Sequence, residues 1–300
     1  MPITTEMIGR TGAPASEHVE DRWLMNYAAA VGDLTPHYYD NRGDTVLPGH
    51  PAYISHLEWE AISNLHEVLG ELTAIERLQG VHSYNHTALS REVRSGDVLS
   101  SITSVVGVER RRSGARLTLK TVTTDVRDEV VAISHTATVF RGVPLNGDTL
   151  VPDAPVSQRP AAADRSSRSG TIQIGPLAPY VFSECARDYG IIHTDIEVAT
   201  RAGLPGLILH GTGTIAYALS DIVNHELGGD PTAVAGFQAS LRAMVMCPST
   251  TRIEVFDDRP HGTVWFELLT EDGSRAISQG AVRVRPTSPP PAVARNRALT

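Results

Sequence analysis

The chain has 300 residues, of which 41% are hydrophobic and 20% are charged, and its mean hydropathy is -0.12. These values are typical of a soluble globular protein with two domains or one large one. The formal net charge of -8 and the pI near 5.8 argue against a nucleic-acid-binding protein, which would normally carry a basic face.

The first half of the sequence predicts helices followed by strands. Residues 1–18 are polar and irregular, and residues 20–31 place apolar side chains at helical spacing. After a turn rich in Gly and Pro, residues 52–72 predict a longer helix with one apolar stripe. Between residues 80 and 141, runs rich in Val, Thr and Ile alternate with polar residues, which predicts a meander of strands. This order indicates an α+β fold in which the sheet wraps around the helix.

The second half repeats this order after a break. Residues 143–170 are dominated by Pro, Ala, Ser and Gly, so we expect a linker there. We expect an N-terminal domain at residues 1–142, a C-terminal domain at residues 171–286 and a disordered tail at residues 287–300. Within the second domain the sequence predicts helices at residues 180–187 and 212–227, and strands at residues 234–245, 250–257, 262–271 and 275–285.

The repeat extends to the polar residues. Asp33 precedes Asp40 by the same seven positions that separate Asp188 from Asp195. The position five residues after Asp33 is Tyr38, whereas the second copy has a histidine there. The sequence therefore predicts a duplicated unit in which only the second copy keeps an acid/base pair.

The candidate site lies in the second copy. Asp188 and His193 flank Gly190, whose backbone freedom would let a short loop bring both side chains to one point. Histidine has an ordinary pKa of about 6.5, so it can act as acid or base near neutral pH. A turn rich in Gly and Pro then leads to His210 and Gly211, where the next helix is expected to begin. The unpaired N–H groups of that helix start could stabilise an oxyanion.

Simpler roles for these residues stay open at this point. A histidine beside a loop is often structural, and His210 could serve packing or a hydrogen bond. Asp195 could cap the next helix.

The string FSxxxxDxxxIHxD followed by AGLPGLILHG resembles the signature of the MaoC-like (R)-specific enoyl-CoA hydratases and dehydratases. The segment PGLILHG is especially similar to the sequence of the subgroup with two hotdog domains that includes mesaconyl-CoA hydratase-like proteins. The first half resembles the degenerate dehydratase domain of that subgroup, and the resemblance covers about residues 15 to 285. It implies a double hotdog, in which two antiparallel sheets each wrap around a long central helix and join edge to edge.

Carried over by position, the resemblance implies that Asp188 and His193 are the catalytic pair and that the N–H of Gly211 is the oxyanion donor. Three positions depart from the family pattern: Arg187 stands where Gly is usual, Gly190 where Asn is usual and Ile191 where Pro is usual. We expect the residues that bind substrate to be His210, Thr212, Tyr38 and Arg242. Arginines that could hold the phosphates of CoA or of a carrier are Arg242, Arg91 and Arg94, although solvated surface charge explains them equally well.

The leading hypothesis is therefore a hydro-lyase that adds or removes water across the α,β double bond of an acyl thioester. Its substrate would be an acyl-CoA or acyl-carrier-protein thioester, and we expect no metal or redox cofactor because the sequence has no phosphate loop, dinucleotide fingerprint or ligand cluster. Two alternatives are a hotdog thioesterase and a non-catalytic acyl-binding subunit.

The cellular setting is also an expectation. The two cysteines, Cys185 and Cys247, have neither disulfide-framework nor metal-site spacing. The N-terminus has no signal-peptide core, and no apolar run approaches a membrane span. We expect a cytoplasmic homodimer that binds neither membranes nor nucleic acid.

Overall fold

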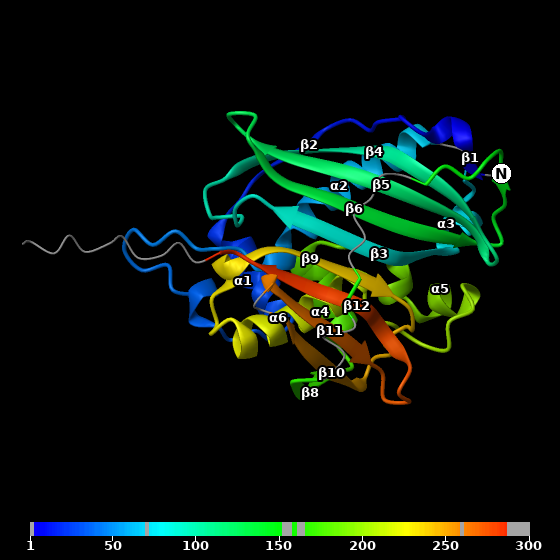
Figure 1. The fold of residues 1–300 in the computed structure, drawn as a ribbon. Helices are drawn as coiled ribbons and strands as arrows, with labels where there is room; N and C mark the ends of the chain where they lie inside the picture. The colour runs from blue at the N-terminus through cyan, green and yellow to red at the C-terminus, as the bar shows by residue number, and fades with distance from the viewer. Residues whose placement is uncertain (1–2, 70–71, 152–157, 161–165, 259–260, 287–300) are drawn as a thin grey trace, which may run out of the picture.

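One continuous antiparallel sheet runs through the protein (Figure 1). The computed structural model describes residues 3–69, 72–151, 158–160, 166–258 and 261–286. The ten strands of the sheet lie in the order β2-β4-β5-β6-β3-β9-β12-β11-β10-β8. Their bounds are β2 Ala15–His18, β3 Gly80–Leu89, β4 Val98–Arg111, β5 Gly114–Asp125, β6 Val130–Arg141, β8 Arg168–Ile174, β9 Val234–Leu241, β10 Ser249–Asp258, β11 Thr263–Leu269 and β12 Arg275–Val284.

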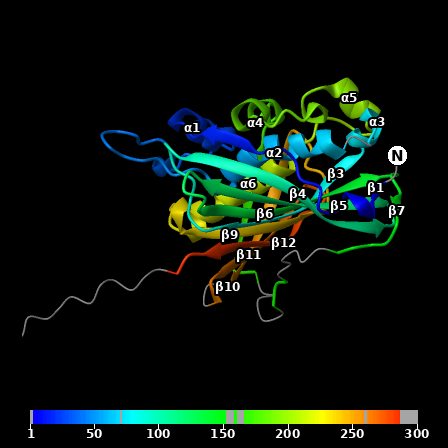
Figure 2. The ribbon, with the colours of Figure 1, turned by 90° about the horizontal axis from the view of Figure 1, so that it is seen from above.

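Each half contributes one long helix. In the first half α2, Ile54–Leu69, packs on β2, β4 and β5, and in the second half α6, Gly211–Glu226, packs on β8, β11 and β12. Figure 2 shows α1, α2 and α4 on the same side of the sheet. The shorter helices are α1 Asp21–Ala30, α3 Ala74–Leu78, α4 Ala178–Ala186 and α5 Ile196–Arg201, with 3-10 turns at η1 Thr5–Met7, η2 Pro36–Tyr38, η3 Pro51–Tyr53, η5 Ile191–His193 and η6 Pro231–Ala233.

The strand order confirms the predicted double hotdog. The five strands of the first half and the five of the second follow each other in mirrored order, and β3 pairs with β9 at the centre, with Asn85 opposite Ala239. Joining the two sheets at this seam removes two exposed edges, so that only β2 and β8 remain at the ends. A separate short pair, β1 Ile3–Thr4 and β7 Leu145–Asn146, is parallel.

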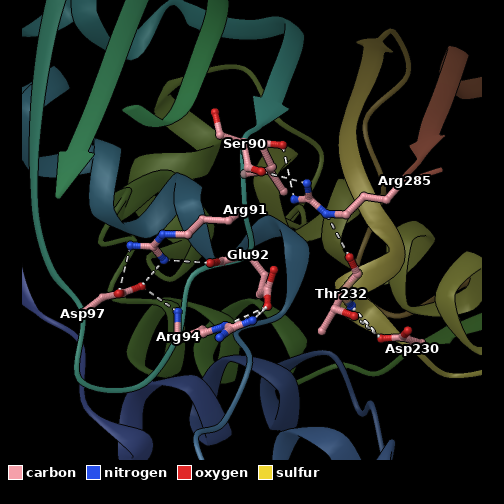
Figure 3. Close-up of polar contacts among 9 residues, drawn as sticks. Ser90, Arg91, Glu92, Arg94, Asp97, Asp230, Thr232 and Arg285 are labelled. Atoms are coloured by element: carbon pink, nitrogen blue, oxygen red, sulfur yellow. Dashed lines mark hydrogen bonds and ion pairs between the residues drawn. The ribbon is translucent and has the colours of Figure 1, made fainter. Parts of the chain in front are cut away.

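The two halves also share one hydrophobic core. Tyr27 of α1 packs edge to face against Phe182 of α4, and both rings are fully buried. The apolar, small-residue face of α6 lies in the same core, with Leu219 completely inaccessible to solvent. Arg285, at the end of β12, ties the halves together again, because its guanidinium donates to the backbone oxygens of Leu89 and Ser90 (Figure 3).

The structure adds elements that the sequence did not predict. Strand β2 lies in the segment expected to be irregular, and β8 begins inside the expected linker, where it pairs with β10. Helix α3 was also not predicted, and α5 was anticipated only as the helix that Asp195 could cap. The expected disordered tail at residues 287–300 lies outside the described residues. In the part of the chain that the structure describes, no helix is long and apolar enough to cross a membrane.

Candidate active site

A cavity of about 400 Å³ lies between the two halves. Its walls come from one face of α2 and from β3 in the first half, and from the 188–193 loop, the start of α6 and residues 241–245 in the second. Ile191 and Met244 line it and are 52% and 42% exposed, so the cavity reaches the surface beside them.

Asp188 follows the end of α4 and lines this cavity. The preceding Arg187 adopts a left-handed conformation with φ of 52°, a geometry that glycine adopts more easily. The Asp188 carboxylate accepts a hydrogen bond from Thr212 Oγ1 at 2.9 Å. Burial raises the pKa of Asp188, and the hydrogen bond from Thr212 opposes that shift. The carboxyl group is therefore prepared to hold a proton at a pH where an exposed aspartate would have lost it.

His193 ends the 3-10 turn η5 and has a fixed tautomer. Its Nδ1 lies 3.0 Å from the backbone oxygen of Ile208, which can only accept, so Nδ1 carries the hydrogen and Nε2 keeps its lone pair. Burial lowers the pKa of His193 to about 4. The imidazole is consequently neutral near pH 7 and can accept a proton at Nε2.

Gly190 shows that these two side chains converge. A Cβ atom built on Gly190 would lie 3.5 Å from His193 Nε2 and 3.8 Å from Asp188 Oδ1. Both reactive atoms therefore border the same small space beside the glycine. The structure thus places together the acid/base pair that the sequence predicts.

The start of α6 faces the same cavity. The backbone N–H of Gly211 is in the first turn of α6 and has no acceptor among the described residues. It adds to the positive end of the helix dipole. A Cβ on Gly211 would come within 3.0 Å of His82 Nδ1 and 2.9 Å of Leu241 Cδ1. Because Gly211 has no side chain, the cavity stays open at this point.

His210 and Thr212, both expected to bind substrate, line the cavity but also hold Asp188 and His193 in place. The His210 ring stacks on His193 with a centroid distance of 3.8 Å. Its Nε2 lies 3.0 Å from the backbone oxygen of Asp188 and 3.1 Å from Ser183 Oγ. Burial lowers the pKa of His210 to about 4, so this ring too is neutral. Asp195 caps α5 through hydrogen bonds to two backbone N–H groups.

Tyr38 does not line the cavity, so its expected role in substrate binding is corrected. Its ring is completely buried in the equivalent region of the first half, where it packs against His50. His50 lies within hydrogen-bonding distance of Ser220 on α6, at 3.1 Å, and Asn224 of the same helix donates to Asp33. This region of the first half therefore connects the two halves, because its polar side chains Asp33 and His50 contact α6 of the second half.

The candidate phosphate-binding arginines differ in their surroundings. Arg242 is exposed and lines the cavity. Figure 3 shows instead that Arg91 and Arg94 are engaged by carboxylates: Arg91 donates to Asp97 at 2.7 Å, and Arg94 donates to Glu92 at 2.7 Å. Neither lines the cavity, so these two are structural.

Other polar residues of the cavity were not singled out from the sequence. Arg77 and Arg141 lie in its wall, and Arg141 Nε is buried without a hydrogen-bond partner among the described residues. Glu58 of α2, which is buried, and His82 of β3, which is partly buried, line the same cavity as the second-half loop although they come from the first half. One signal for Glu58 was available, because it precedes Ala61 by three positions and Leu65 by seven and so lies on the apolar side of its helix.

Comparison with known proteins agrees with this architecture. The family model described as "FAS1-like, dehydratase domain region" matches residues 6–134. The peroxisomal enoyl-CoA hydratase 2 of Arabidopsis thaliana is 23% identical over 215 residues, which cover 68% of each chain. Enoyl-CoA hydratase ChsH3 of Mycobacterium tuberculosis is 37% identical over 71 residues, covering 24% of this chain and 25% of that protein.

A solved structure has the same fold over nearly the whole length. The MaoC-like dehydratase from Phytophthora capsici superposes with a TM-score of 0.80 at 18% identity, covering 94% of this chain and 98% of the other. At this identity the superposition shows the shared fold. The chain is therefore similar to a FAS1-like dehydratase region in its first half, to named enoyl-CoA hydratases in sequence, and to a MaoC-like dehydratase in fold.

Proposed function

We propose that this protein is a hydro-lyase that interconverts a 2-enoyl thioester and a 3-hydroxyacyl thioester of coenzyme A, with Asp188 and His193 as its acid/base pair. The observation that carries the proposal is the convergence of His193 Nε2 and Asp188 Oδ1 beside Gly190. The curated relatives named as enoyl-CoA hydratases support the reaction class.

In the dehydration direction, His193 begins the reaction. Its neutral Nε2 takes the proton from the α-carbon, and the electron pair of that C–H bond moves into the thioester carbonyl as an enolate. The N–H of Gly211 at the start of α6 would hold the enolate oxygen. One backbone donor of this kind contributes on the order of 3 kcal/mol to the transition state.

Asp188 completes the step. The enolate electrons return to form the α,β double bond, the bond from the β-carbon to oxygen breaks, and the hydroxyl leaves as water with the proton of Asp188. A carboxyl whose pKa is raised by burial suits this role, because it still holds a proton to donate. Hydration follows the same steps in reverse, with Asp188 accepting a proton from water and His193 delivering one to the α-carbon.

The arginines along the cavity suggest where coenzyme A lies. Arg77 and Arg242 are exposed and Arg141 is half-buried, and all three line the cavity. Guanidinium groups are favoured partners for phosphates. We place the phosphates of the coenzyme beside these three arginines and the reacting carbons beside Gly190 and Gly211.

Incubation of the purified protein with crotonyl-CoA tests the proposal. Loss of the enoyl absorbance without release of free thiol is the expected result, together with loss of that activity in His193→Ala. Release of free coenzyme A thiol would instead indicate the thioesterase, since a hotdog fold supports either chemistry. A His193→Ala enzyme with wild-type turnover on any enoyl thioester would overturn the assigned mechanism.

A further inference from the structure

One face of α2 forms a long wall of the cavity, and its composition is unexpected for a channel that holds an alkyl chain. The residues of this face are spaced three and four apart, so they form a single stripe. Apolar and polar side chains are mixed along it: Ser55, Glu58, Trp59, Ile62, His66 and Leu69. A wall made only for hydrocarbon would have no reason to bury a carboxyl group.

Of these polar side chains, Glu58 has the largest free-energy cost of burial, because it carries a carboxyl group. Its side chain is 1% exposed, and its Oε1 has no hydrogen-bond partner among the described residues. Burial raises the pKa of Glu58 to about 8, so the carboxyl group is protonated near neutral pH and can donate a hydrogen bond. Buried polar atoms usually find partners, and one that lacks a partner in a cavity wall suggests that a ligand supplies it.

Polar groups on the sheet lie near Glu58. Ser134 of β6 interacts with Glu58, and its hydroxyl is 2.9 Å from that of Thr87 on β3. Thr87 Oγ1 in turn lies 3.2 Å from Asn85 Oδ1, to which it donates. The Asn85 amide, which also lines the cavity, therefore has its oxygen engaged and keeps N–H groups to donate. Both Glu58 and Asn85 thus favour an acceptor atom.

These donors are distant from the reacting carbons. Asn85 is three residues along β3 from His82, which borders Gly211. A strand rises about 3.3 Å per residue, so the separation is roughly 10 Å. An acceptor on the substrate would therefore be several carbons beyond the double bond.

We propose that Glu58 and Asn85 bind a carbonyl or hydroxyl oxygen on the acyl chain, and that the substrates of this enzyme are oxygenated enoyl thioesters rather than simple alkyl ones. The proposal rests on the hydro-lyase activity proposed above and names its substrate class. In this role Glu58 determines specificity and takes no part in the chemical steps.

The test uses matched substrates. The wild-type protein is given trans-2-decenoyl-CoA and a set of derivatives in which a keto group is moved carbon by carbon along the far half of the chain. We expect kcat/KM for the best keto substrate to exceed that for the alkyl thioester by about tenfold or more, since an unpaired buried donor is satisfied only by the keto oxygen. Dissociation constants of the saturated forms of both thioesters, measured by calorimetry, give a readout that needs no turnover.

The variants separate the explanations. Glu58→Met should abolish the preference for the keto group, and Glu58→Gln, which still donates, should keep most of that preference. Glu60→Met makes the same change at an exposed position of α2 and should leave the preference unaltered. Equal kcat/KM for keto and alkyl substrates, or a preference that survives Glu58→Met, would overturn the inference while the hydro-lyase stands. Preferential binding of keto thioesters without any hydration would reject the hydro-lyase and retain the binding role of Glu58.

Discussion

The imidazole rings of His193 and His210 stack with their centroids 3.8 Å apart and their planes inclined by 28°. Together with the hydrogen bond to Ile208, this stack holds Nε2 of His193 toward the cavity. His210 is itself fixed by Ser183 and by the Asp188 backbone. The His210 ring, directly before α6, therefore contacts both His193 and Asp188.

His210→Ala should lower turnover by about tenfold to 100-fold, because His193 loses the surface that orients it. His210→Phe keeps the stack and should retain more activity than the alanine variant. Steady-state hydration of an enoyl-CoA measures both, with Tyr38→Phe as a control outside the cavity. Equal losses in the two variants would indicate that the hydrogen bonds of His210 matter rather than its stacking.

The pH profile should show the protonation states of the pair. In the proposed mechanism, dehydration needs a neutral His193 and a protonated Asp188. Because burial lowers the pKa of His193 to about 4, protonation of its imidazole should lower the rate only at acidic pH. Because burial raises the pKa of Asp188, the alkaline limb should lie above the ordinary carboxyl range. Measurement of kcat/KM for a 3-hydroxyacyl-CoA against pH checks both limbs, and a profile controlled by a group near pH 6.5 would contradict the assignment.

Substitution of Thr212 tests whether the alkaline limb of the pH profile belongs to Asp188. Its hydroxyl donates to Asp188 Oδ2, and this hydrogen bond favours the ionised carboxylate. Thr212→Val should therefore raise the pKa of Asp188 further and move the alkaline limb to higher pH, while Thr212→Ser should leave it in place. A role limited to packing would lower turnover in Thr212→Val without moving the limb.

Gly190 tests whether space between the pair is essential. Its backbone has φ of -62° and ψ of 102°, which alanine also adopts, so Gly190→Ala should change the free energy of unfolding by less than about 1 kcal/mol. The new Cβ would lie 3.0 Å from His193 Cδ2, however, and would displace the imidazole. We expect at least a tenfold loss of turnover. Gly175→Ala, at a position where a Cβ meets nothing within 4 Å, is the matched control.

The sequence predicted the long strands well because their alternation reflects one buried and one less buried face. Runs such as β4 and β6 are long enough for that alternation to be unambiguous. Strand β2, with the sequence ASEH, is polar and four residues long, and it is a strand because β4 provides its partner. Such edge strands depend on pairing more than on local preference, so they could not be predicted from their own residues.

The proximity of Asp188 and His193 was predictable because both side chains belong to one short loop. The remaining cavity was not, because His82 and Glu58 reach it from the other half, and their position depends on how β3 joins β9. The same limitation explains why the position of Tyr38 outside the cavity was not predicted. Its sequence position corresponds to His193, but α6 packs against the first loop and leaves that tyrosine buried away from the cavity.

Glu58 should also lower the stability of the protein, and in a pH-dependent way. Its pKa is about 8 in the folded protein against an ordinary value of 4.5, so the folded state retains a proton that the unfolded chain releases. The unfolded state therefore binds fewer protons between these values, and the free energy of unfolding falls as the pH rises from 4.5 to 8. Each pKa unit corresponds to about 1.4 kcal/mol, which puts the cost at pH 8 on the order of 3 to 5 kcal/mol.

Glu58→Gln removes this cost, since the amide has nearly the same shape and cannot ionise. The variant should unfold at higher denaturant concentration than the wild type at pH 8, and the difference should shrink toward zero below pH 4.5, where both folded and unfolded wild-type chains are protonated at this position. Chemical denaturation across that range checks the prediction, and Glu60→Gln on the exposed side of α2 should show no such trend. A difference that stays constant with pH would mean that the buried acid does not titrate differently on folding. Functional sites often contain groups that lower stability, so the predicted stability gain in Glu58→Gln would agree with a functional carboxyl in the cavity.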